Sequence, residues 1–115
     1  MYYEARKQAL NNGNEFHLAA FTNKGVIGTN KPKCTAKFRK RYKNSSETHY
    51  ELHAEVDLIL RCNEVPSKIR VMRFMKDGTR TMARPCVHCQ HFLKHAGVKS
   101  VMFTNWDGQW EEMKL

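Results

Sequence analysis

The sequence predicts an α/β fold, a three-layer α/β/α domain around a central mixed five-stranded sheet. Three observations lead to this class. Helix-like and strand-like segments alternate along the chain. One helical segment lies between two strand-like segments, and such a crossover calls for parallel pairing of the two strands. A turn at residues 105–108 then adds an antiparallel last strand. With 115 residues, the chain has the length of a single domain, residues 1–115.

The first part of the chain predicts a short helix followed by a hairpin. Residues 2–11 have apolar side chains at helical spacing. Residues 16–22 form an apolar run suited to a buried strand, and residues 26–30 begin a second strand after an Asn-Lys-Gly turn. Pro32 and the basic residues after it interrupt regular structure, so we expect a long loop there.

The second part of the chain predicts two helices and the rest of the sheet. Residues 53–63 are nearly continuously apolar, which indicates a helix buried on most sides. Residues 68–75 predict a strand and residues 79–83 a short return strand. The next helix has Pro85 at its entrance, where a missing N–H is harmless, and Gly97 at its end. The last two predicted strands are residues 98–104 and 109–115.

The composition of the chain argues against a membrane-spanning or secreted protein. No stretch approaches the ~18 apolar residues that a membrane-spanning helix needs. The first residues lack the apolar run of a signal peptide, so we expect a cytoplasmic protein. Four cysteines in such a compartment indicate metal binding or catalysis before disulfides. Two of them, Cys34 and Cys62, lie outside any motif and are expected to be buried free thiols.

The net charge of +9 is concentrated in one short segment, which we call the basic run. It contains seven positive residues and no acidic one, which leaves only +2 for the rest of the chain. Such a run attracts phosphate, on a nucleotide or on single-stranded nucleic acid. The alternative is a solvated loop without a ligand. The basic run consists of Lys31, Lys33, Lys37, Arg39, Lys40, Arg41 and Lys43.

Five residues in two groups carry the chemistry. His53 and Glu55 form an H-x-E sequence, and Pro85, Cys86 and Cys89 form a P-C-x-x-C sequence. This pair of sequences is the mark of zinc-dependent base deaminases. One imidazole and two thiolates hold zinc through three protein ligands and leave the fourth position for water. Both groups fall at predicted helix starts, where the partial positive charge favours a thiolate over a thiol.

On these residues the chain resembles the cytidine/deoxycytidylate deaminase superfamily, from about residue 16 to residue 104. The resemblance implies the same layered α/β fold and a Zn2+ cofactor. It also implies hydrolytic deamination of a cytosine nucleoside or nucleotide to the uracil product with release of ammonia. Zinc would supply hydroxide near neutral pH, and Glu55 would carry protons to ring N3 and to the departing ammonia. Metal ligands would be His53, Cys86 and Cys89.

The resemblance also suggests substrate contacts and self-association. Asn30 matches the position where relatives touch the sugar, with turn formation as the alternative. Ala54 would contact the edge of the base, and Arg84 is a further candidate. Single-domain relatives usually complete their sites with a neighbouring subunit, so we expect a homo-oligomer. Its interface is expected near the C-terminus, at Trp106, Trp110 and Met113.

Several alternatives stay open on sequence alone. Arg84 before the Pro-Cys pair differs from the residue found there in vertebrate polynucleotide deaminases and in the tRNA adenosine type. The antiparallel last strand resembles nucleoside deaminases, and the 22 residues between Asn30 and His53 resemble the longer loop of deoxycytidylate-type and phage enzymes. A deaminase of single-stranded DNA or RNA is the main rival, because aromatic residues interleave the basic run. His88 or His91 as a fourth ligand would instead make a non-catalytic, zinc-stabilised module.

Overall fold

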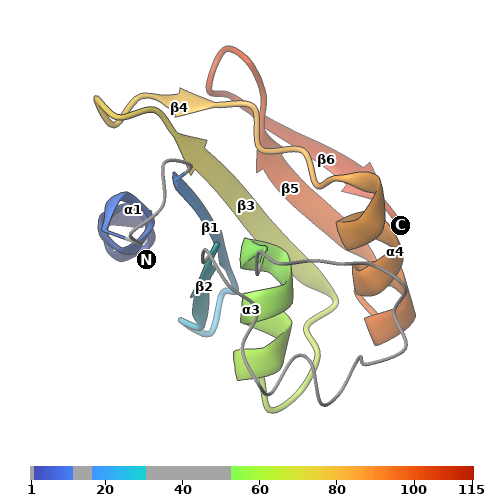
Figure 1. The fold of residues 1–115 in the computed structure, drawn as a ribbon. Helices are drawn as coiled ribbons and strands as arrows, with labels where there is room; N and C mark the ends of the chain where they lie inside the picture. The colour runs from blue at the N-terminus through green and yellow to red at the C-terminus, as the bar shows by residue number, and fades with distance from the viewer. Residues whose placement is uncertain (1, 12–16, 31–52) are drawn as a thin grey trace.

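The computed structural model describes residues 2–11, 17–30 and 53–115 (Figure 1). They form a mixed α/β structure in which every predicted helix and strand is present. The basic run lies outside the described residues. The elements are α1 (Tyr2–Leu10), β1 (His17–Phe21), β2 (Ile27–Thr29), α3 (Ala54–Arg61), β3 (Lys68–Phe74), β4 (Arg80–Thr81), α4 (Val87–Ala96), β5 (Ser100–Thr104) and β6 (Trp110–Lys114).

The strands form one open sheet in the order β2-β1-β3-β5-β6. β3 and β5 are parallel and are joined through α4, as the crossover argument predicts, and all other pairs are antiparallel. The sheet has a sixth strand, because the two residues of β4 pair with the end of β3. The return strand predicted at 79–83 is only two residues long, because the chain then turns from β3 toward β5. The Ala83 N–H is donated to the carbonyl of Thr104 in β5, at 2.8 Å.

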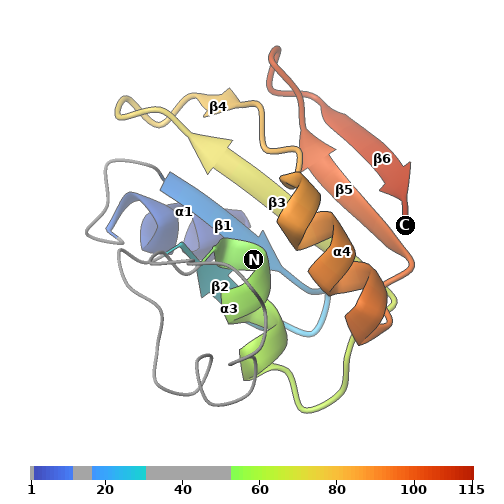
Figure 2. The same cartoon turned by 45° about the vertical axis from the view of Figure 1, so that its right-hand side comes forward.

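Alternating side chains give the sheet two different faces. Ala19 and Phe21 of β1 pack with α1 residues, whereas Ala20 packs with α3 and α4 residues. Figure 2 shows α3 and α4 next to each other, covering the face of β1, β3 and β5 that α1 does not touch. None of the helices within the described residues is long and apolar enough to cross a membrane.

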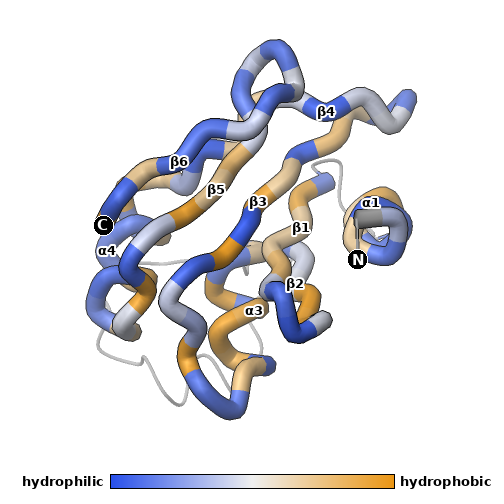
Figure 3. The backbone as a smooth tube through the Cα atoms, turned by 180° about the vertical axis from the view of Figure 1, so that it is seen from behind, coloured by the Kyte–Doolittle hydropathy of each residue, from blue (hydrophilic) through white to orange (hydrophobic). Residues whose placement is uncertain are grey.

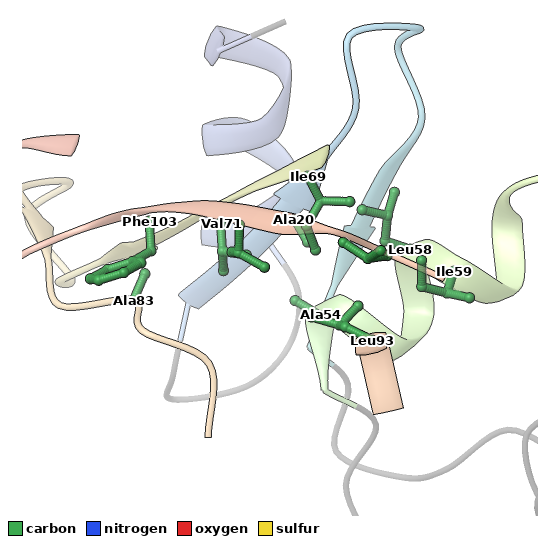
Figure 4. Close-up of a cluster of buried hydrophobic side chains, with 11 residues drawn as sticks. Ala20, Ala54, Leu58, Ile59, Ile69, Val71, Ala83, Leu93 and Phe103 are labelled. Carbon is green, nitrogen blue, oxygen red and sulfur yellow. The ribbon is translucent and has the colours of Figure 1, made fainter. Parts of the chain in front are cut away.

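The larger core cluster holds α3 and α4 against the sheet (Figure 4). Leu58 and Ile59 from α3 and Leu93 from α4 are almost fully buried against Val71 and Phe103 of the strands. Each such side chain contributes about 1.5–3 kcal/mol through burial. Since β3 and β5 run in the same direction, this packing brings the N-terminal ends of both helices to the same end of the sheet.

Gly28 permits a very close contact between β2 and α3. A Cβ atom there would lie 2.7 Å from the Ala54 carbonyl oxygen and from the Leu58 Cα, and closer still to the Leu58 amide nitrogen. All three are backbone atoms of α3, which cannot rotate away. The absence of a side chain on β2 therefore sets how deeply the first turn of α3 sits on the sheet.

The starts of α3 and α4 are close to the sequence prediction, with one correction. His53 is the N-cap of α3, and Cys86 is the N-cap of α4. Pro85 therefore lies one residue before the cap and not at the first helical position. Its carbonyl oxygen instead accepts a hydrogen bond from Gln90 Nε2, at 2.8 Å. At the other end of α4, Gly97 adopts the left-handed conformation, with φ 110°, that ends the helix as expected.

Candidate metal centre

The three predicted metal ligands converge on one point. His53, Cys86 and Cys89 each offer one ligand atom, and these atoms lie within 4.8 Å of one another. His53 Nδ1 is 3.2 Å from Cys89 Sγ and 3.6 Å from Cys86 Sγ. A tetrahedral zinc ion with ordinary bond lengths separates a nitrogen and a sulfur ligand by about 3.6 Å. The donor set and its spacing therefore fit zinc.

Helix ends position these side chains. Neither His53 nor Cys86 makes a side-chain hydrogen bond that caps its own helix, and the ligand atoms of both lie in the cluster with Cys89. Cys89 lies one turn into α4, on the side of the helix that carries Cys86. Val56 and Leu60 of α3 pack around Cys89, which couples the two helices next to the site. The three candidate ligands are thus gathered close to the positive ends of two helix dipoles.

The two thiols have opposite electrostatic environments. Hydrogen bonds from Cys89 and then from His53 lower the pKa of Cys86 to about 3, so this side chain is a thiolate. The hydrogen bond to Cys86 and the burial of Cys89 raise the pKa of the Cys89 thiol far above its usual value. The Cys89 thiol therefore keeps its proton and uses it in a hydrogen bond to the Cys86 thiolate. Metal binding releases such protons, because zinc takes thiolates as ligands.

Glu55 lies directly beside this cluster. It is the second residue of α3 and is only 3% exposed. Burial raises the pKa of its carboxyl group, opposed mainly by its own backbone N–H and by His53. A side-chain hydrogen bond links this carboxyl to Cys89. A buried carboxyl with a raised pKa next to a metal site has the properties of a group that accepts and returns protons.

Asn30 has a structural partner. Its side chain is buried at the end of β2, and its Oδ1 accepts the Leu18 N–H at 2.9 Å. This bond ties the start of β1 to the end of β2, which is a structural role across two strands and not the turn formation considered as the alternative. Contact with a sugar stays a prediction. The neighbouring residue, Thr29, donates its N–H to Asp57 Oδ2 at 3.0 Å, which joins β2 to α3.

Two residues that support the site were missed in the sequence. Asp57 is buried in α3 and also accepts a bond from Arg61 Nε at 3.0 Å. Its position four residues before Arg61, the spacing of a helical ion pair, was the available signal. Thr104 is fully buried, and its Oγ1 donates to the Thr81 carbonyl at 2.7 Å. Together with the bond from Ala83, this anchors the loop that leads into α4, and no sequence pattern indicates it.

The other candidates do not belong to the cluster of three ligand atoms. Ala54 is fully buried at the start of α3, and Arg84 is exposed in the loop before Pro85. His88 and His91 are exposed on α4 and do not belong to the cluster, and no described residue supplies a fourth ligand. Cys62 is half-buried at the C-cap of α3, so its predicted full burial is wrong, because the cap position leaves one side of it open.

The residues expected at a subunit interface differ in environment. Trp106 is 72% exposed in the turn after β5. Trp110 is half-buried and packs against Phe21, with the ring centroids 6.5 Å apart. Met113 faces the opposite side of β6 and packs against the larger core cluster, so it supports the domain itself. Self-association stays a prediction.

Compared with known protein families and with characterised proteins, the chain matches no family model and no individual protein. The inference to function therefore depends on the geometry of the site.

Proposed function

We propose that the protein is a zinc-dependent hydrolase that deaminates a cytosine nucleoside or nucleotide, such as cytidine, deoxycytidine, CMP or dCMP. The products are the uracil compound and ammonia. The observation that carries this proposal is the placement of Glu55. A zinc site that only stabilises a fold needs no buried carboxyl beside its ligands, whereas a hydrolytic site needs a proton carrier there.

In this proposal, His53, Cys86 and Cys89 would hold zinc, which would lower the pKa of a bound water and so activate it near neutral pH. Glu55 accepts a proton from that water and passes it to ring N3. The water oxygen bonds to C4, and Glu55 then takes the remaining proton of that C4 hydroxyl and gives it to the exocyclic amino group. The C4–N bond breaks, ammonia leaves and the oxygen stays as the C4 carbonyl. The burial of Glu55 supports these transfers, because its raised pKa lets the carboxyl hold a proton between the steps.

The remaining expectations extend the proposal. Packing of α1 on one sheet face and of α3 and α4 on the other supports the three-layer, cytidine deaminase-like class. Ala54 backbone groups would contact the base, and Asn30 and Arg84 would contact the sugar or phosphate. A cytoplasmic location, a single domain and a homo-oligomeric state belong to the same proposal.

The test is direct. Zinc-loaded protein is incubated with cytidine, deoxycytidine, CMP, dCMP and a cytosine-containing single-stranded oligonucleotide, and ammonia and uracil products are measured. Turnover of a mononucleoside or mononucleotide supports the proposal. Turnover of the oligonucleotide alone favours the polynucleotide alternative, for which the aromatic residues within the basic run are the supporting observation. Zinc binding without turnover of any of these supports the non-catalytic module.

A further inference from the structure

The sheet face opposite α3 and α4 is only partly covered by a helix. α1 packs over β1, β2 and the end of β3, and no described helix packs over the same face of β5 and β6. Figure 3 views the molecule from this side, with α1 next to β1 and with β3, β5 and β6 in front of the other two helices. Hydrophilic residues recur along β3 and β6 in this view.

The strand register assigns the residues of this face. Partners across the ladder point to the same side. Lys68 lies opposite Ser100, which lies opposite Lys114, and two residues further along Arg70 and Glu112 flank Met102. Thr104 lies opposite Trp110, and Phe74 lies opposite Arg80. The basic sheet face is therefore Lys68, Arg70, Arg80, Trp110, Glu112 and Lys114.

The charge of the basic sheet face is strongly positive. Four basic side chains and one acidic side chain give it a net charge of +3. The acid, Glu112, is paired with Lys68 at 2.9 Å. At one end the face continues into a depression of about 550 Å³, lined by Ser67, Lys68, Lys99, Ser100, Glu112 and Lys114. The depression adds a fifth cation, Lys99, and two hydroxyl groups suited to phosphate oxygens.

Trp110 holds two guanidinium groups in place. Arg70 Cζ lies 5.6 Å from the centroid of the Trp110 ring, and Arg80 Cζ lies 6.0 Å from it. Trp110 is itself fixed by its edge contact with Phe21. Guanidinium groups positioned on an aromatic ring lose less conformational freedom on binding, and their planar donors match phosphate oxygens. Trp110 therefore orients two guanidinium groups, of which Arg80 lies at one end of the basic sheet face.

The arrangement of these charges favours a linear ligand. Lys68 begins β3, and Arg80 pairs with Phe74 at the other end of this strand. These two positions are six residues apart along β3, which corresponds to about 20 Å. A single phosphate or a mononucleotide cannot contact cations across this length. A second copy of the chain would bring another +3 surface against it. A polyanion with regularly spaced phosphates satisfies both conditions.

We propose that the basic sheet face is a binding site for the backbone of single-stranded nucleic acid, on the side of the sheet opposite the metal centre. Arg70 and Arg80 contact successive phosphates, and the lysines at the depression contact the next ones. This proposal does not depend on deaminase activity. The basic run could also bind nucleic acid, so the variants below leave that run unchanged.

Binding is measured by fluorescence anisotropy of a labelled, mixed-sequence single-stranded oligonucleotide at several salt concentrations. The double variant Arg70→Gln with Arg80→Gln is compared with the matched control Lys24→Gln with Lys94→Gln. The control removes the same charge from exposed positions off the basic sheet face. We expect the first variant to bind at least tenfold more weakly, with a salt slope lower by about 1.4, which corresponds to two phosphate contacts. We expect the control to bind within about twofold of the parent, because distant charges are screened.

Two further variants keep the test independent of folding. Lys68→Gln with Lys114→Gln changes two exposed side chains and should also weaken binding severalfold, whatever happens to Trp110 packing. Trp106→Phe leaves Trp110 as the only tryptophan of the chain, and its emission should change when the oligonucleotide binds. Unchanged Trp110 emission during binding seen by anisotropy would place the ligand elsewhere and overturn the proposal.

Other ligands complete the experiment. Duplex DNA, vesicles with anionic phospholipid and polyglutamate are titrated under the same conditions. Tighter binding of the single strand than of these three supports the proposal. Equal binding of polyglutamate, or preference for the vesicles or the duplex, would mean that the face is a general anionic contact or serves another partner, and the proposal fails.

Discussion

Replacing Gly28 by Ala tests the claim that the close contact between β2 and α3 positions the metal ligands. The backbone of Gly28 has no positive φ, so an alanine there is not strained by its own conformation. The effect is purely steric. Its Cβ would lie 2.7 Å or less from three backbone atoms of α3, where ordinary contacts begin at 3.4 Å. The helix must therefore move away from β2 by roughly 1 Å, because close-packed interiors absorb little of such an overlap.

The expected magnitude follows from that displacement. Added atoms in a well-packed core typically destabilise by about 1–3 kcal/mol. Since backbone atoms cannot turn aside, we expect the upper end, about 3 kcal/mol, and a fall in Tm of about 10 °C. The displacement also moves His53 relative to Cys86 and Cys89, whose sulfur atoms now lie 3.6 and 3.2 Å from Nδ1. Loss of support for a ligand typically weakens metal binding by about 10–100-fold.

The assay combines thermal unfolding with zinc competition against a chromophoric chelator. Gly97→Ala is the control. Gly97 has φ 110°, and a Cβ there would meet nothing closer than 4.0 Å. This variant should lower Tm by strain at the end of α4, yet keep the parent zinc affinity. If Gly28→Ala has the parent Tm and zinc affinity, the close contact does not position His53, and the reasoning is wrong.

Three further predictions concern the site. Glu55→Gln should keep the fold and the zinc content while turnover of the best substrate falls about 10²–10⁴-fold; exposed Glu64→Gln is its control, and near-parent ammonia release would remove Glu55 from the proton-transfer role. Thr104→Val should leave the Thr81 carbonyl without its donor, destabilise the protein by about 1–3 kcal/mol and weaken zinc binding, as measured by unfolding and chelator competition; unchanged values for both would refute its anchoring role. Free zinc at a hundredfold excess over its Kd should stabilise the protein by about 2.7 kcal/mol, as measured by thermal unfolding. Cys89→Ala should lose most of this stabilisation, and an equal gain in this variant would place zinc elsewhere.

Local patterns determined most of the secondary structure and indicated the candidate metal ligands. The apolar run that becomes α3, the glycine that ends α4 and the turn before β6 act over a few residues, so the sequence alone predicts them. The spacing of Cys86 and Cys89 likewise places both on one side of a helix before any tertiary contact is known. Composition also shows the excess of positive charge, although not where all of it gathers.

Tertiary structure decided what depends on contacts between distant segments. His53 reaches Cys86 across 33 residues only because α3 and α4 pack side by side on the sheet. The close approach at Gly28 and the Thr104 anchor join residues that no sequence period relates. Trp110 and Met113 look alike as apolar residues of one strand, yet the pleat turns them to opposite faces. Which face of a strand is buried depends on all the residues that pack against it, and these residues come together only in the folded chain.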